Sequence, residues 1–136
     1  MKYLLDTNAC VAVLRGKPKS VAERLDAAVR EGHLILLSTI VLHELWYGAL
    51  NSSQVAEQSR HLSEFLNSGM ELTPFDEHDA KGAGEIRAVL ESSGSRIGAY
   101  DTLIAAQCRR KDITLVTANV SEFSRVKGLR WEDWTR

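Results

Sequence analysis

The chain has 136 residues and a formal net charge of −1, with 44% apolar and 26% charged residues. This length and composition predict one compact domain over residues 1–136, and they argue against a disordered, collagen-like or multidomain chain. No apolar run approaches the roughly 20 residues that span a bilayer, and the first residues lack a signal-peptide pattern. We therefore expect a cytoplasmic protein that has no membrane contact.

Cysteine content and charge distribution add two expectations. Cys10 and Cys108 lie far apart in apolar surroundings, so both are expected to be reduced, buried thiols.

Residues 109–136 carry seven basic and four acidic side chains, whereas residues 1–108 carry ten basic and fourteen acidic side chains. This basic excess permits a nucleic-acid partner without requiring one.

Apolar runs alternate with segments of helical spacing along the whole chain. Two of the helical segments begin with capping residues, which are Ser20 with Glu23 in a capping box, and Asp76. In chain order, the expected elements are a strand at 2–7, a helix at 17–32, a strand at 33–38, helices at 39–51 and 53–69, a strand at 70–75, a helix at 76–94, a loop and helix over 95–112, a strand at 113–119 and a short strand at 129–134.

This alternation predicts an α/β fold with a central parallel sheet of about four to five strands, covered by helices on both faces. Ligands of such sheets bind beyond the carboxyl ends of the strands. Asp6 follows the first strand and Asn119 follows the fourth, so both are expected at that edge.

Two further acids stand near the same predicted edge. Glu44 lies in a helix that leaves the second strand, and Asp101 begins an apolar helix. Each acid also has an ordinary structural explanation. Asp6 could close a turn on the following backbone, Glu44 could pair with His43 or an arginine, and Asp101 could be a first-turn acid favoured by the helix N-terminus.

Three carboxylates at one place repel each other unless a cation offsets their charge. A site built only from carboxylates suits Mg²⁺ or Mn²⁺ better than zinc. The four histidines are scattered over different elements without zinc-site spacing, and the chain has no phosphate-binding glycine motif.

Five segments in order resemble the PIN-domain family, and specifically the toxin ribonucleases of VapBC toxin–antitoxin pairs. They are LLDTN at 4–8, STIVLHELWYGA at 38–49, IGAYDTLIAAQ at 97–107, LVTANVSEFSRVKGL at 115–129 and EDW at 132–134. The resemblance implies a three-layer α/β/α domain. It also implies an endoribonuclease that uses Mg²⁺, with Mn²⁺ as a substitute, to activate water for cleavage of single-stranded or loop RNA. The expected partners are a second copy of the chain and a VapB-type antitoxin.

The resemblance places the family's three acids on Asp6, Glu44 and Asp101. The family's fourth site position falls on Asn119 where many PIN domains have Asp, so Asn119 and Glu122 both remain candidate metal ligands. Nearby polar side chains are expected to orient the acids, and basic side chains at the rim are expected to attract RNA. The orienting candidates are Thr7, Asn8, Ser38 and Thr117, and the basic candidates are Arg15, Lys17, Arg96, Arg109, Arg110 and Arg125.

Two other functions stay open from the sequence. One is a PIN-like domain that binds RNA without cutting it. The other is a phosphotransferase that forms an aspartyl-phosphate on Asp6, although Asn8 stands where one such family needs a second aspartate. The RNA target, the number of metal ions and the identity of the antitoxin do not follow from these residues.

Overall fold

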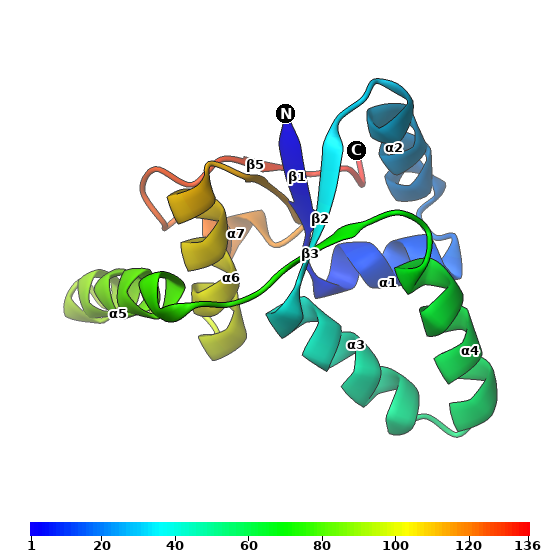
Figure 1. Cartoon of the computed structure of the whole chain (residues 1–136). Coiled ribbons are helices and arrows are strands. Elements are labelled where there is room, and N and C mark those ends of the chain that lie inside the picture. Colours follow the sequence, from blue (N-terminus) through cyan, green and yellow to red (C-terminus); the bar gives the residue numbers. More distant parts are fainter.

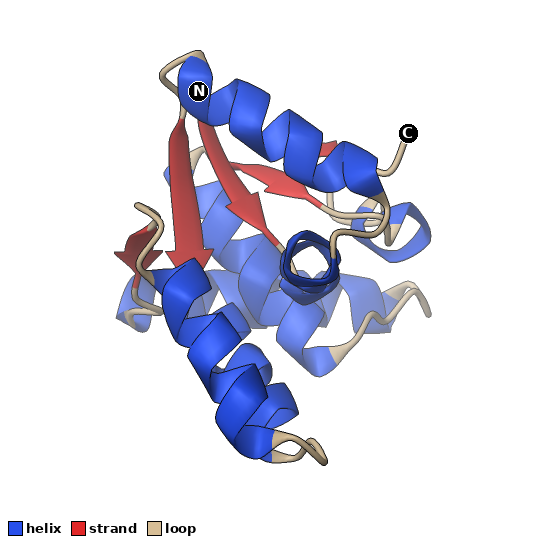
Figure 2. Cartoon of the chain, turned by 90° about the vertical axis from the view of Figure 1, so that its right-hand side faces the viewer, coloured by secondary structure: helices blue, strands red, loops and turns tan.

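The computed structural model describes all residues, 1–136, as a parallel sheet with helices on both faces (Figures 1 and 2). The elements in chain order are β1 (Lys2–Leu5), α1 (Thr7–Arg15), α2 (Lys19–Arg30), β2 (Leu34–Ser38), α3 (Thr39–Leu50), α4 (Val55–Leu66), β3 (Glu71–Thr73), α5 (Glu77–Ser92), α6 (Ala99–Lys111), β4 (Thr114–Val116), α7 (Val120–Phe123) and β5 (Trp131–Glu132). The predicted α/β class is confirmed. None of these helices is both long enough and apolar enough to cross a membrane.

The sheet has five strands in the order β3-β2-β1-β4-β5, and every pair is parallel. β1 is the central strand. Its Leu4 pairs with Leu36 of β2 on one side and with Leu115 of β4 on the other. Because every strand runs the same way, the segments that follow β1, β2 and β4 all leave the sheet at one edge, as the sequence predicted.

The core lies between the sheet and its two helical layers. Leu4, Leu115 and Ile104 are at most 1% exposed, and Val41 of α3 is fully buried. Burial of a leucine or isoleucine side chain stabilises a fold by about 1.5–3 kcal/mol. These residues fix α3 and α6 against the central strands, and those two helices carry Glu44 and Asp101.

Two local predictions were wrong, and two helices were not predicted. The first strand was expected to reach residue 7, whereas β1 ends at Leu5 and residues 7–15 form helix α1. The predicted capping box of α2 does not form, because Pro18 is the N-cap residue and the buried Ser20 hydroxyl has no hydrogen-bond partner. The short helix α7 (Val120–Phe123) was also not expected. By contrast, Asp76 caps α5 in a complete capping box with Asp79.

Candidate carboxylate site at the sheet edge

Asp6 directly follows β1 and is the N-cap residue of α1. Its Oδ1 accepts a hydrogen bond from the backbone N–H of Ala9 at 2.8 Å, and the residue is only 6% exposed. Asp6 therefore does bond to the backbone that follows it, as the structural explanation of this residue expected. Burial raises the pKa of the Asp6 carboxyl and the charge of Glu44 adds to that rise, while the Thr117 hydroxyl and the Ala9 amide oppose it.

Glu44 lies on α3, half-buried beside the apolar stripe of that helix. The Thr7 hydroxyl, in the first turn of α1, donates a hydrogen bond to Glu44 Oε1 at 2.7 Å. Glu44 pairs neither with His43 nor with an arginine, so that alternative is not what the structure shows. The bond from Thr7 instead holds Glu44 toward the residues that follow β1.

Asp101 lies in the first turn of α6, beside Asn119 and Glu122 of the α7 segment. The Asn119 Nδ2 group donates to Glu122 Oε2 at 2.6 Å and to Asp101 Oδ2 at 3.4 Å. Burial, together with the neighbouring Glu122, Asp6 and Glu44 carboxylates, raises the pKa of Asp101 to about 7. The same Asn119 amide lowers the pKa of Glu122.

Four carboxylates from separate segments therefore influence one another at the carboxyl ends of β1, β2 and β4. No three His, Cys, Asp or Glu side chains stand close enough together to enclose a cation as the side chains are placed. The donor set is nevertheless suited to a hard divalent cation, because it offers only carboxylate and amide oxygens. The raised pKa of Asp101 reflects negative charge that such a cation would offset.

Comparisons with known proteins agree with this geometry. The family model of the PIN domain matches residues 3–129. The chain belongs to the PIN-domain family. Over 99% of both chains it is 38% identical to a protein of Shigella flexneri named tRNA(fMet)-specific endonuclease VapC. Over the full length of both chains it is 37% identical to Ribonuclease VapC2 of Rickettsia felis. Its relatives are thus VapC ribonucleases, as the sequence motifs suggested.

Solved structures of VapC complexes have the same fold as this PIN domain. VapBC2 from Rickettsia felis, bound to a DNA fragment from its promoter, superposes with a TM-score of 0.90 at 36% identity, covering 97% of this chain and 98% of that one. DNA-bound VapBC from Salmonella typhimurium superposes with a TM-score of 0.88 at 34% identity, covering 98% of each chain. These structures confirm the predicted three-layer fold.

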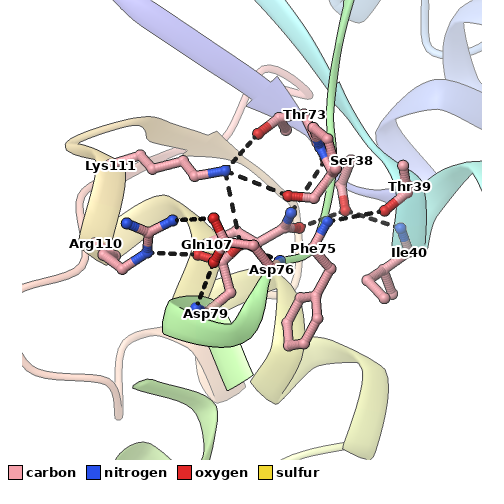
Figure 3. Close-up of polar contacts among 11 residues, drawn as sticks. Ser38, Thr39, Ile40, Thr73, Phe75, Asp76, Asp79, Gln107, Arg110 and Lys111 are labelled. Carbon is pink, nitrogen blue, oxygen red and sulfur yellow. Dashed lines mark hydrogen bonds and ion pairs between the residues drawn. The ribbon is translucent and has the colours of Figure 1, made fainter. Parts of the chain in front are cut away.

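A polar network ties together the elements of the PIN domain that carry the acids (Figure 3). Ser38 caps α3 by accepting from the Ile40 N–H at 3.0 Å, and its hydroxyl also donates to the Gln107 side chain of α6. Gln107 is fully buried, and its Nε2 donates to the backbone carbonyl of Thr73 at 3.2 Å. Ser38 thus links the helix of Glu44 to the helix of Asp101, as a positioning residue that does not touch either carboxylate. Gln107 was not anticipated from the sequence.

The predicted basic candidates divide into two groups. Arg110 is held by two acids, since its Nε donates to the fully buried Asp79 at 2.7 Å and its Nη2 to Asp76 at 2.7 Å (Figure 3). These bonds give Arg110 a structural role that joins α6 to α5, and its predicted contact with RNA stays a prediction. Arg109 donates to the backbone carbonyl of Lys127 at 3.3 Å.

The remaining basic candidates, Arg15, Lys17, Arg96 and Arg125, are exposed and form no ion pair. Arg125 donates to the backbone carbonyl of Arg96 at 3.0 Å, and its charge helps to lower the pKa of Glu122. Arg15 and Lys17 form no ion pair, and with Asn8 they line a cavity of about 250 Å³ that also reaches Thr117. Asn8 makes no side-chain hydrogen bond and is exposed, so its expected orienting role has no contact to support it.

Proposed function

We propose that this PIN-domain protein is the toxin ribonuclease of a VapBC-type pair, a divalent-metal-dependent endoribonuclease whose partner is a VapB-type antitoxin. The observation that carries the proposal is the gathering of Asp6, Glu44, Asp101 and Glu122 at one edge of the sheet, with Thr7 and Asn119 bonded to three of them. The ribonuclease names of relatives that align over the whole chain support it.

Asp6, Glu44 and Asp101 are proposed to hold Mg²⁺, or Mn²⁺ in its place. When bound, the cation would lower the pKa of a water molecule and offset charge on a phosphate under attack. Glu122 is the proposed fourth acid. Asn119 is better suited to positioning than to ligation, because its amide N–H group is directed at two of the acids. The amide orientation follows from the hydrogen-bond network around it.

The protein's other residues have separate tasks in this proposal. The hydrogen bond from Thr7 fixes the Glu44 carboxylate and so limits the rotamers of this proposed metal ligand. Arg15, Lys17, Arg96 and Arg125 are exposed cations that would attract the RNA backbone. Their attraction would weaken with salt, because exposed charges are screened.

The partners of the protein are proposed from its relatives. The structural neighbours are VapBC assemblies, some on DNA, so a VapB-type antitoxin and a second copy of the toxin chain are the expected partners. One relative is named for action on tRNA(fMet), which makes that RNA the first substrate to test. Light scattering of the isolated chain checks the dimer.

The direct test is cleavage of tRNA(fMet) by the purified protein in Mg²⁺, in EDTA and as the Asp6→Asn variant. We expect cleavage only by the wild-type chain in Mg²⁺, with 5′-phosphate and 3′-hydroxyl ends on the products. Equal cleavage in all three samples would assign the activity to a contaminant. RNA binding without cleavage in any of them would favour the non-catalytic alternative.

A further inference from the structure

Two aromatic side chains meet across the gap between α3 and α6. The His43 and Tyr100 ring centroids are 5.5 Å apart with an interplanar angle of 66°, and His43 Nε2 lies 3.3 Å from the Tyr100 hydroxyl. The residues are 57 positions apart in the chain. Neither ring takes part in the hydrogen bonds that orient the carboxylates, so the site described above does not account for them.

The pair lies one residue away from two of the acids along the chain. His43 is the chain neighbour of Glu44, and Tyr100 is the chain neighbour of Asp101. The charge of Glu44 contributes to the raised pKa of Asp101, so the two acids lie near each other. The backbone of each ring residue thus lies within about 4 Å of the backbone of a proposed metal ligand.

Both rings are open to solvent. Tyr100 is 47% exposed and His43 is also exposed, whereas Leu45 on the core side of α3 is buried. Tyr100 also lines a groove of about 470 Å³ between α5 and the segment before α6, with Phe75, Ile97 and Arg96 among the other lining residues. The Tyr100 ring thus has free volume beside it, and the positively charged Arg96 lines the same groove.

The acidic centre of the site cannot itself supply the energy that binds and positions RNA. The carboxylates repel phosphates, and exposed arginines attract any polyanion without fixing its position. Proteins that bind single-stranded nucleic acid commonly position it by stacking bases on aromatic side chains. An exposed tyrosine and histidine beside the reacting position have the chemical character needed for this.

We propose that His43 and Tyr100 form a stacking platform for a base of the RNA strand next to the scissile phosphodiester. The inference rests on the proposed ribonuclease function and adds to it a substrate-positioning site. The Tyr100 ring belongs to a residue that is 47% exposed, and its contact with His43 holds that ring in place. The groove beside Tyr100 gives the stacked base room, and Arg96 lies where the adjoining phosphate can reach it.

The test uses an RNA oligonucleotide with 2-aminopurine at successive positions, bound to the Asp6→Asn protein so that the strand stays intact. Stacking quenches 2-aminopurine fluorescence. We expect quenching at one position near the cleavage site, and loss of it in the Tyr100→Leu form. Removing an aromatic stacking partner should weaken binding roughly 5- to 150-fold. Tyr100→Phe keeps the ring and should bind within about twofold of the parent, by the same stacking argument.

Cleavage kinetics and a matched control separate this role from a structural one. With Asp6 intact, Tyr100→Leu should raise KM far more than it lowers kcat. The control is Tyr47→Leu, because Tyr47 is a 63% exposed tyrosine one turn further along α3, and it should leave KM unchanged.

Three outcomes would overturn the platform. They are unquenched 2-aminopurine at every position, equal RNA binding by the Tyr100→Leu form, and a change of oligomeric mass with RNA affinity unaltered. The last outcome would assign the rings to an interface between protein chains. Retained cleavage by the Asp6→Asn protein is a different result, and it would refute the proposed function itself.

Discussion

Replacing Asp101 by asparagine should stabilise the metal-free protein at pH 8 while abolishing its activity. Asp101 has its pKa raised from 3.8 to about 7 by burial and by the surrounding carboxylates. A shift of that size on a fully shielded group corresponds to about 4 kcal/mol. Asp101 is only half-buried, so solvent screening reduces the expected gain to about 1–2 kcal/mol, or roughly 3–10 °C in melting temperature for a chain of this length.

The sign of the pH dependence follows from proton binding. Between the ordinary carboxyl pKa and about pH 7, folded Asp101 holds a proton that the unfolded chain has released. The stability of the wild-type protein therefore falls as pH rises through this window, and the loss is complete above about pH 7. The advantage of Asp101→Asn should be largest at pH 8 and less than half as large at pH 5.

Thermal melts in EDTA at pH 5 and pH 8 measure this difference. Asp26→Asn is the matched control, because Asp26 is an exposed acid on α2 and its loss should change the free energy of unfolding by at most about 0.5 kcal/mol. In Mg²⁺ the wild-type melting temperature should rise and that of Asp101→Asn should rise less, since a ligand stabilises only the protein that binds it. An Asp101→Asn protein that melts at the wild-type temperature at pH 8 in EDTA would refute the crowding of negative charge at this site.

Three further variants test the parts around the acids. Thr7→Val should lower kcat/KM for RNA about 10- to 100-fold through loss of the bond to Glu44, and Thr7→Ser should keep it; equal rates for both would contradict the orienting role. Asn119→Asp should lower the melting temperature in EDTA and enlarge the increase that Mg²⁺ produces, and an unchanged Mg²⁺ effect would count against a cation beside Asn119. Arg110→Ala should lower the melting temperature clearly more than Arg109→Ala, because it removes the nearer of the two cations that pair with the fully buried Asp79 carboxylate and leaves only Lys111 at 3.6 Å. A smaller effect would contradict the structural role of Arg110.

The sheet could be predicted because its strands are short apolar runs covered on both faces, as HLILLS illustrates. Helix α1 was missed for a physical reason. TNACVAVLR contains two valines and a cysteine, which are weak helix formers, and the helix depends on the Asp6 cap and on a buried face of Ala9, Cys10 and Ala12. At α2, Pro18 takes the N-cap position, so Ser20 falls inside the helix and cannot cap it.

The positions of Asp6, Glu44 and Asp101 could be predicted, because each follows a strand or lies near a helix N-terminus. Their partners could not. The contacts from Thr7 to Glu44 and from Arg110 to Asp79 join residues 37 and 31 positions apart, and they depend on how α1 meets α3 and how α5 packs on α6. Charge patterning alone cannot distinguish an arginine at an RNA-binding rim from one paired with a buried acid.

Anomalous diffraction from crystals soaked in Mn²⁺ shows directly whether the carboxylates at the sheet edge hold a divalent cation. We expect one manganese peak or two adjacent ones among the Asp6, Glu44 and Asp101 carboxylates, with those side chains drawn toward the ion, and no peak there in Asp101→Asn crystals. An anomalous map without density between these side chains, or with manganese only elsewhere on the protein, would contradict it.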